Sequence, residues 1–446
     1  MNTYHVVIDE TMLRNALQTD LHESMDLFSM QQVLYFIFLG LLPAYVIYKV
    51  PVKYRTFKTE LWSKIKTILI LLAIIATLLY IFSKYYTSFF REHKPLRFTA
   101  NPLYWIYATG KYINLTYNNG PIIVKPVGED AIIEDTNKSK KLVIMVVGEA
   151  ARADHFSLNG YKRETNPMLQ QEDIINFPHV YSCGTSTAVS VPCMFSLLDR
   201  TDYSYKKGRL QENVIDVLKH TKKIALLWRD NNSDSKGVAL RIKHENYRIP
   251  KNNTICTEGE CRDIGMLQGL DNFISKQQGK DIFIVLHQMG NHGPAYYKRY
   301  TKAFEKFIPI CRTNQLEECT KEEIANAYDN ALLYTDNFLY QVIQFLKKYD
   351  NKYQTVMLYM SDHGESLGEK GLYLHGLPYF MAPDAQKHIG AFIWLGKQSK
   401  NNLNETHLKH ISNQTFSQDY LSDSLLGLFN VQTNVYDSNM DIFHEN

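Results

Sequence analysis

The chain has 446 residues, of which 45% are hydrophobic, and a formal net charge of +3. This length allows a full-sized core and more than one domain. A charge so close to balance gives no electrostatic case for a nucleic-acid partner, and none is expected.

Two strongly apolar segments near the start predict membrane-spanning helices. Residues 33–50 and 67–83 each approach the roughly 20 apolar residues that cross a bilayer. A buried helical hairpin is the alternative, but a core helix of this length usually has a polar face. From Lys49 to Lys66 the chain has six basic residues and the single acid Glu60, which indicates a cytoplasmic loop between the two segments. The outer flanks are therefore expected to face away from the cytoplasm.

These features divide the first third of the chain. We interpret residues 1–86 as a membrane region with two transmembrane helices and an outward-facing N-terminal segment. An exported N-terminus needs a signal peptide or an earlier span, and residues 1–18 resemble neither. Either the first span inserts with its N-terminus outward or upstream membrane helices are missing from this sequence, and we favour the second. Residues 87–140 form a juxtamembrane connector whose basic and aromatic residues suit a membrane surface, although a folded linker fits equally well.

From residue 141 to the end, short β-branched runs alternate with helical stretches. The runs are apolar on both faces, as in parallel strands covered by helices. Between the third and fourth runs, residues 324–349 repeat apolar side chains at helical intervals. We therefore expect an α/β domain over 141–446, with a mostly parallel sheet sandwiched by helices. The five runs are 141–149, 223–230, 282–288, 355–364 and 388–396.

The six cysteines all lie beyond the predicted spans, in three close pairs. In an oxidising compartment such pairs indicate local disulfides. Zinc–thiolate sites are the rival interpretation, but they favour shorter spacings than two of these pairs have. Six cysteines allow many connectivities, so sequential pairing rests on proximity alone. The pairs are Cys183 with Cys193, Cys256 with Cys261, and Cys311 with Cys319.

Several apolar runs carry a polar or metal-capable residue at or just beyond their C-terminal end. In open α/β sheets ligands bind beyond these strand ends, so the residues are expected to converge. A lone His or Asp at a strand end is usually structural. Together, however, their mixed nitrogen and oxygen donors suit Zn²⁺ or Mn²⁺. The residues are Glu149, Asn232, Lys236, His287, His292, Asp362, His363 and His375.

The stretch YSCGTSTAVSVPCMFS places four hydroxyls between two cysteines. Serine and threonine are common in loops, but one of these hydroxyls is also a candidate nucleophile. Such a hydroxyl needs a base or a metal. No G-x-S-x-G elbow is present, so activation by a divalent cation, which also polarises a phosphoryl oxygen, fits better. Spacing does not identify the nucleophile among Thr185, Ser186, Thr187 and Ser190.

Six long motifs stand in order along the chain: VVGEAARADHFSLNGYKRET, SCGTSTAVSVPCMFS, LWRDNNSDSKG, LHQMGNHGPAYYKRY, YDNALL and SDHGESLGEKGLYLHG. Together they resemble the motifs of the lipid A phosphoethanolamine transferases. The match runs from about residue 4 to the end and is closest to the colistin-resistance (MCR) branch. These enzymes are metal-dependent members of the alkaline phosphatase/sulfatase superfamily.

The resemblance implies roles for individual residues. The nucleophile falls on Thr187, the second threonine of CGTST, and Glu365 falls near the metal-binding histidines. The implied cofactor is Zn²⁺, with one ion tightly bound and a second site that takes a metal or a phosphate. Ligands of the first ion fall on Glu149, Thr187, Asp362 and His363, and the second site falls on His292 and His375. Contacts to the phosphoethanolamine group fall on Asn232, Ser233, Lys236 and His287.

The implied reaction moves phosphoethanolamine from phosphatidylethanolamine to lipid A or lipopolysaccharide through a covalent Thr187 intermediate, which gives polymyxin (colistin) resistance. The implied protein is a monomer and a multi-pass protein of the bacterial inner membrane, with the 141–446 catalytic domain in the periplasm. The chain departs from the family in matching only its last two spans and in having Ala150 in place of the usual Thr. Rival functions are a phosphoglycerol transferase, a sulfatase or a phosphomonoesterase on the same scaffold, or a non-enzymatic membrane-tethered binding protein.

Overall fold

The structure is a computed structural model. It describes residues 7–18, 28–51, 56–83, 89, 94–117, 123–134, 139–257, 259–277 and 279–445. The described residues form two compact units. Those within 27–107 make up the smaller unit, and those before 27 or after 107 make up the larger one.

Two helical stretches in the smaller unit are long and apolar enough to cross a membrane. The first, Met30–Lys49, comprises α3 (Met30–Tyr35), a π-helical turn (Phe36–Leu41) and α4 (Leu42–Lys49). The second is α5 (Phe57–Ile81). Their mean hydropathies are 1.7 and 2.2, and neither apolar window is buried in the protein. The second helix begins ahead of the predicted segment, so three lysines expected in the loop lie on its first turns: Lys58, Lys64 and Lys66. Residues 52–55 of that loop lie outside the described residues.

A seven-stranded sheet organises the larger unit. The strand order is β2-β13-β9-β1-β8-β4-β5, in which β9, β1, β8, β4 and β5 run parallel. Only β13 runs antiparallel, to both of its neighbours. The strands are β1 (Lys141–Gly148), β2 (Ile174–Asn176), β4 (Ile224–Asp230), β5 (Lys243–Asn246), β8 (Asp281–His287), β9 (Gln354–Ser361) and β13 (Ala391–Leu395).

Four of the five predicted runs are thus adjacent parallel strands, and the mostly parallel sheet is confirmed. The fifth run, 388–396, was predicted as another parallel strand, which is wrong. It divides at Gly390: β12 (His388–Ile389) pairs with β3 (Val180–Tyr181), and β13 joins the main sheet antiparallel. A Cβ at Gly390 would lie 2.5 Å from the Phe156 ring, so this break requires a glycine.

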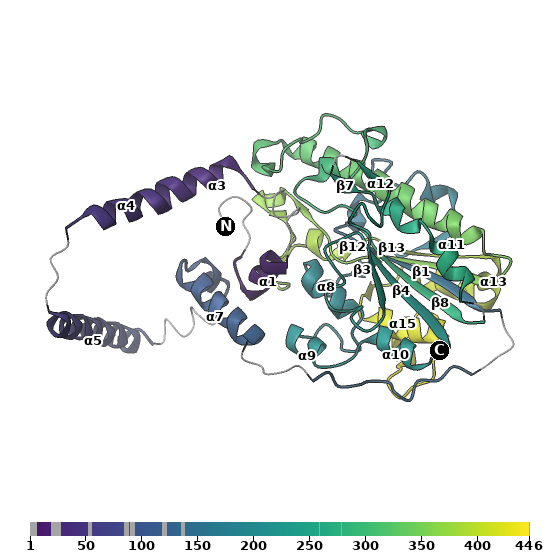
Figure 1. The fold of residues 1–446 in the computed structure, drawn as a ribbon, viewed down its shortest axis with the longest axis horizontal. Coiled ribbons are helices and arrows are strands. Elements are labelled where there is room, and N and C mark those ends of the chain that lie inside the picture. Colours follow the sequence, from purple (N-terminus) through teal and green to yellow (C-terminus); the bar gives the residue numbers. More distant parts are fainter. Residues whose placement is uncertain are drawn as a thin grey trace. The chain divides into compact units, whose positions relative to one another are not determined.

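Helices cover both faces of the sheet, as Figure 1 shows. On one face α11 (Leu270–Ser275) and α12 (Lys321–Lys347) share a core with Leu142, Ile144 and Val146 of β1. On the other face α8 (Thr187–Met194), α10 (Val214–His220) and α15 (Tyr420–Leu428) pack with the alternate β1 residues, of which Met145 is one. Successive strand residues point to opposite faces, so a strand buried on both sides must be apolar throughout. The sandwich is confirmed.

The described residues include further α-helices. Near the N-terminus, α1 (Glu10–Gln18) belongs to the larger unit, where the buried guanidinium of Arg14 stacks 3.5 Å from the Tyr205 ring centroid. The predicted connector contains α7 (Leu103–Tyr117), whose exposed side chains include Trp105 and Ile113. The others are α9 (Tyr205–Arg209), α13 (Lys397–Asn402) and α14 (Glu405–Ile411).

Candidate active site

Two carboxylates, an imidazole and a hydroxyl meet where β1 and β9 end and α8 begins. Thr187 Oγ1 donates to Glu149 Oε2 at 3.0 Å and lies 3.3 Å from His363 Nε2. The same nitrogen is 3.3 Å from Glu149 Oε1 and 3.3 Å from Asp362 Oδ2. Glu149, Asp362 and His363 are fully buried, and Thr187 is 8% exposed. The predicted metal ligands around the nucleophile therefore come together.

The donor atoms of this cluster fit a zinc ion. His363 Nδ1 lies 2.8 Å from the Gly364 carbonyl oxygen, which can only accept, so Nδ1 carries the proton and Nε2 offers a lone pair. Among the described residues, Glu149 Oε1 and Asp362 Oδ2 are buried without a hydrogen-bond partner. Buried polar atoms are normally satisfied, so these two oxygens suit a bound cation. Carboxylate and imidazole donors lie within 4.8 Å of one another, and this donor set suits Zn²⁺.

The electrostatics of the cluster also favour a cation. Burial raises the pKa of Glu149, but the four surrounding histidines, His363 foremost, lower that pKa to about 2. Burial raises the pKa of Asp362, and the charge of Glu149 adds to the rise, giving about 6. The two neighbouring carboxylates therefore compete for one proton. A divalent ion between them would hold both in the charged form.

A second group of histidines adjoins the first. The His375 ring centroid lies 4.2 Å from that of His363 and 6.1 Å from that of His292. His375 Nδ1 is 2.8 Å from Glu365 Oε2, which leaves Nε2 available for a ligand. Burial lowers the pKa of His375, but Glu365 outweighs this effect and raises the pKa to about 9. Tyr296 holds the other Glu365 oxygen with a 2.9 Å hydrogen bond. The residues predicted for a second metal or phosphate site are thus also together.

The predicted substrate contacts form a chain along the turn after β4. Asn232 Nδ2 donates to Glu149 Oε2 at 2.9 Å. The Asn232 side-chain oxygen accepts from the backbone N–H of Ser233 at 2.6 Å. Lys236 Nζ donates to Ser233 Oγ at 2.6 Å, which brings an ammonium group to this turn. His287, the last residue of β8, lies at the same edge of the sheet.

The hydroxyl-rich loop gives each hydroxyl a different environment. Thr185 Oγ1 donates to the Leu377 carbonyl at 2.6 Å, and Ser190 Oγ donates to the Asp362 carbonyl at 2.6 Å. Ser186 Oγ is buried and has no hydrogen-bond partner in the described part of the chain. Thr187 is therefore the one hydroxyl of the four that contacts the side chains of the cluster. It is also the first residue of α8, where the helix dipole favours negative charge.

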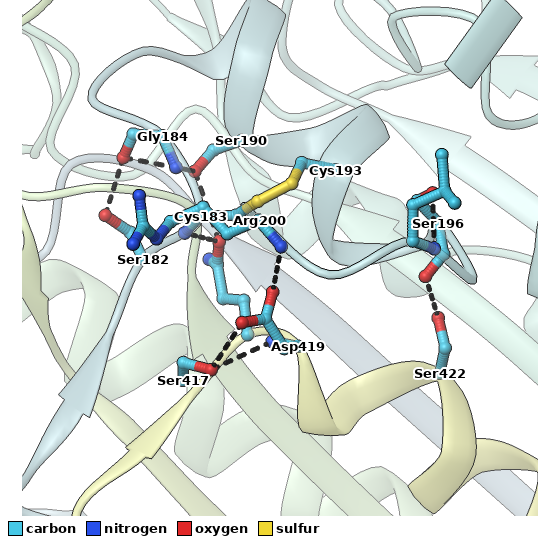
Figure 2. The surroundings of a disulfide bond; sticks show 12 residues. Ser182, Cys183, Gly184, Ser190, Cys193, Ser196, Arg200, Ser417, Asp419 and Ser422 are labelled. Atoms are coloured by element: carbon cyan, nitrogen blue, oxygen red, sulfur yellow. Dashed lines mark hydrogen bonds between the residues drawn. A yellow bond between two sulfur atoms is a disulfide. The ribbon is translucent and has the colours of Figure 1, made fainter. Parts of the chain in front are cut away.

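A disulfide closes this loop. Cys183 and Cys193 are bonded, with their Cα atoms 6.1 Å apart. Figure 2 shows the bond beside Ser190, whose hydroxyl accepts from the Gly184 N–H at 3.0 Å. The structure also joins Cys256 to Cys261 and Cys311 to Cys319, so sequential pairing holds for all six cysteines.

Sequence reasoning missed two buried residues that support the site. Gln418 donates to the Ser361 and Asp362 carbonyls at 2.8 and 2.9 Å and accepts from the Cys183 N–H at 2.6 Å. No local pattern marks Gln418, because its partners all lie far away in the sequence. Asp230 accepts from Trp228 Nε1 at 3.1 Å and lies 3.0 Å from His287 Nδ1. Its position at the end of a predicted strand was the available signal.

Known proteins resemble this chain over nearly its whole length. The Sulfatase family model matches residues 141–431, and the model "Phosphoethanolamine transferase EptA/EptB" matches residues 1–117. The phosphatidylethanolamine transferase Mcr-1 of Escherichia coli is 46% identical over 442 residues, which cover 96% of this chain and 80% of that protein. The phosphoethanolamine transferase EptA of E. coli K12 is 40% identical over 454 residues, covering 99% and 81%.

A solved structure agrees with this assignment. The integral membrane protein lipooligosaccharide phosphoethanolamine transferase A of Neisseria meningitidis superposes with a TM-score of 0.91 at 35% identity. The superposition covers 99% of this chain and 83% of that chain. Both the fold and the sequence therefore lead to one conclusion. The chain belongs to the EptA/Mcr family of phosphoethanolamine transferases, within the sulfatase superfamily.

Proposed function

We propose that the chain moves phosphoethanolamine from phosphatidylethanolamine to lipid A through a covalent intermediate on Thr187. The observation that supports the nucleophile is the position of Thr187 Oγ1, 3.0 Å from Glu149 Oε2 and 3.3 Å from His363 Nε2. The name of the Mcr-1 relative supports the donor. The lipooligosaccharide named for the Neisseria relative supports a lipid A-type acceptor.

In this proposal each site residue has a separate role in the displacement at phosphorus. Thr187 attacks the phosphorus, and Glu149 orients the attacking oxygen by accepting its hydrogen bond. The first turn of α8 favours the negative charge that the nucleophile and the phosphate bring. A zinc ion held by Glu149, Thr187, Asp362 and His363 would lower the pKa of the Thr187 hydroxyl and screen charge on the phosphoryl oxygens.

The remaining residues hold the donor and the transferred group. Lys236 supplies an ammonium for a phosphate oxygen, and Asn232 and Ser233 form the turn that positions it. The histidines at 292 and 375 would take a phosphate oxygen or a second metal, and Glu365 fixes the His375 ring.

The transfer occurs in two halves. Donor attack by Thr187 releases diacylglycerol, and a lipid A phosphate then takes the group from the threonine. Each transfer adds an amine to lipid A and reduces its net negative charge. Cationic polymyxins then bind the surface less strongly, because their attraction is largely electrostatic. We place the enzyme in the inner membrane through its apolar helices, with the catalytic domain over 141–446 in the periplasm.

Intact-mass analysis of the full chain after incubation with phosphatidylethanolamine, without acceptor, tests the proposal. We expect a phosphoethanolamine adduct on the peptide that contains Thr187, together with released diacylglycerol. Thr187→Ala should lose the adduct and reduce diacylglycerol release at least ~10³-fold. Thr185→Ala removes a hydroxyl of the same loop that does not reach the cluster, and it should keep the adduct. An adduct that persists in Thr187→Ala contradicts the proposal.

A further inference from the structure

We infer that Asp230 is a positioning residue that holds His287 so that His287 Nε2 gives a proton to the glycerol oxygen leaving the donor. The inference rests on the proposed function and concerns the fate of its leaving group. The nucleophile and its surrounding ligands act on the attacking oxygen and on the phosphoryl oxygens. None of these residues serves the glycerol oxygen, whose bond to phosphorus must break.

The two residues are placed by the sheet itself. Asp230 ends β4, His287 ends β8, and the two are direct partners in the parallel register. Asp230 Oδ2 lies 3.0 Å from His287 Nδ1, and the side chains are 2% and 0% exposed. Trp228 Nε1 donates to the same oxygen at 3.1 Å, and the Asn232 backbone N–H donates to Oδ1 at 2.8 Å. The carboxylate is therefore fixed on both oxygens.

This arrangement sets the orientation of the imidazole. A carboxylate only accepts, so His287 Nδ1 carries a proton and Nε2 is turned away from Asp230. His287 Nε2 is buried and has no hydrogen-bond partner among the described residues. Buried polar atoms are normally hydrogen-bonded, so this unpaired nitrogen indicates that a polar ligand atom completes it.

Backbone geometry places His287 beside the cluster that contains Thr187. His287 is the register partner of Val147, two residues before Glu149. Asn232 Nδ2 donates both to Glu149 Oε2 at 2.9 Å and to the carbonyl of Gln288, the residue after His287, at 3.0 Å. Burial lowers the pKa of His287, but the Asp230 carboxylate outweighs burial and raises it above the ordinary value. A second imidazole also approaches this carboxylate, with His244 Nε2 3.9 Å from Asp230 Oδ2. The raised pKa shifts His287 towards the protonated form, which a proton donor needs.

The proton balance closes over the two half-reactions. In the first, deprotonated Thr187 bonds to phosphorus, the bond from phosphorus to the glycerol oxygen breaks, and that oxygen takes the His287 Nε2 proton. Diacylglycerol leaves as the alcohol, and His287 becomes neutral. In the second, a monoprotonated phosphate of the acceptor gives its proton to His287 as its oxygen bonds to the transferred phosphorus. Thr187 leaves deprotonated, and the enzyme returns to its starting state.

A change of leaving group separates proton donation from simple phosphate binding. Glycerol is a poor leaving group without a proton, whereas nitrophenolate leaves as the anion. We compare phosphatidylethanolamine with the p-nitrophenyl ester of phosphoethanolamine on the full chain in detergent micelles. Asp230→Asn and His287→Gln should each slow transfer from the lipid ~10²–10⁴-fold. With the nitrophenyl donor we expect the rate to fall by less than about tenfold.

Two controls keep the test decisive. Asp336→Asn changes another buried carboxylate, which accepts from the Met168 and Leu169 N–H groups and forms no hydrogen bond to a site residue among those described. For this variant the ratio of the rates on the two donors should stay as in the unsubstituted chain. The double variant of Asp230 and His287 should be no slower on the lipid than the slower single variant, because the pair acts as one unit. If Asp230→Asn does not fold, His287→Gln carries the comparison alone.

Three possible results of this comparison of donors lead to different conclusions. Equal losses on both donors overturn the inference in favour of static phosphate binding, and unchanged rates on the lipid donor overturn it in favour of a purely structural pair. If the unsubstituted chain forms no adduct on Thr187 with either donor, the proposed function itself fails.

Discussion

Thr187 Oγ1 lies 3.0 Å from Glu149 Oε2, across a sequence separation of 38 residues. The contact joins the first residue of α8 to the residue that follows β1. It distinguishes Thr187 from the other hydroxyls of the disulfide-closed loop. Thr185 and Ser190 bond to backbone groups and, for Ser190, to Gln418, whereas Ser186 has no hydrogen-bond partner among the described residues. The chemistry of the loop therefore depends on how the loop is held against the sheet edge.

Removal of one carboxylate should abolish zinc binding. Glu149→Gln leaves a neutral amide in the cluster, so we expect loss of bound zinc by elemental analysis. In the chelated unsubstituted chain, zinc at about 100 times its dissociation constant should add about 2.7 kcal/mol to the stability, raising the melting temperature. That rise should disappear in Glu149→Gln. Glu172→Gln, which changes a carboxylate paired with Lys347, should keep it. Equal zinc affinity in Glu149→Gln contradicts the assignment of this cluster.

The Ser190 hydroxyl should matter to the reaction rate as well as to stability. Ser190→Ala removes the 2.6 Å hydrogen bond to the Asp362 carbonyl and costs about 1 kcal/mol. Because Asp362 then loses an anchor, transfer should slow about tenfold or more. Ser422→Ala removes a comparable buried bond, 2.7 Å to the Ser196 carbonyl (Figure 2), away from the cluster. It should lower the melting temperature without slowing transfer. Equal rates in the two variants speak against the anchoring role.

Much of the fold could be predicted because burial leaves a strong signal in the sequence. The runs that became β1, β4, β8 and β9 are apolar on both faces, and only strands covered on both sides require this. Parallel direction then placed Glu149, His287 and Asp362 at one edge. The direction of β13 could not be predicted, because an antiparallel strand buried on both faces has the same composition. Its break depends on the close approach of Phe156 to Gly390.

The site was less predictable where a residue acts through a neighbour. Metal-capable residues at strand ends can be found by type and position. The four loop hydroxyls could not be ranked from their spacing, since their roles depend on partners such as Leu377 and Asp362. Asp230 has no pattern that separates it from a turn-forming Asp. The role of Asp230 depends on His287, its partner in the strand register, and the two residues are brought together only in the folded sheet.

The disulfide at the nucleophile loop should affect activity, whereas a disulfide of similar size elsewhere should not. The bonds of Cys183 with Cys193 and of Cys311 with Cys319 close loops with sequence separations of 10 and 8. The chain-entropy model gives about 3 kcal/mol for each. Replacing either pair by alanines should therefore lower the melting temperature by similar amounts. Only the loss of Cys183 and Cys193 should slow diacylglycerol release, because it frees the loop that presents Thr187. Similar rates in both variants refute this role.

One buried carboxyl should make stability depend on pH. Burial raises the pKa of Asp336 to about 7, against the lowering effect of the Met168 and Leu169 N–H groups. A folded-state pKa above the ordinary 3.8 means that folding favours the protonated form. The stabilising contribution is therefore complete below about pH 4 and is lost as the pH rises towards 7. Over that interval the unsubstituted chain should lose a few kcal/mol relative to Asp336→Asn, whose amide does not titrate. Melting temperatures of both full-length chains, measured by near-ultraviolet circular dichroism from pH 4 to 8, give this difference directly. All other titrating groups are common to the two chains, so a gap that stays constant across the range contradicts the raised pKa.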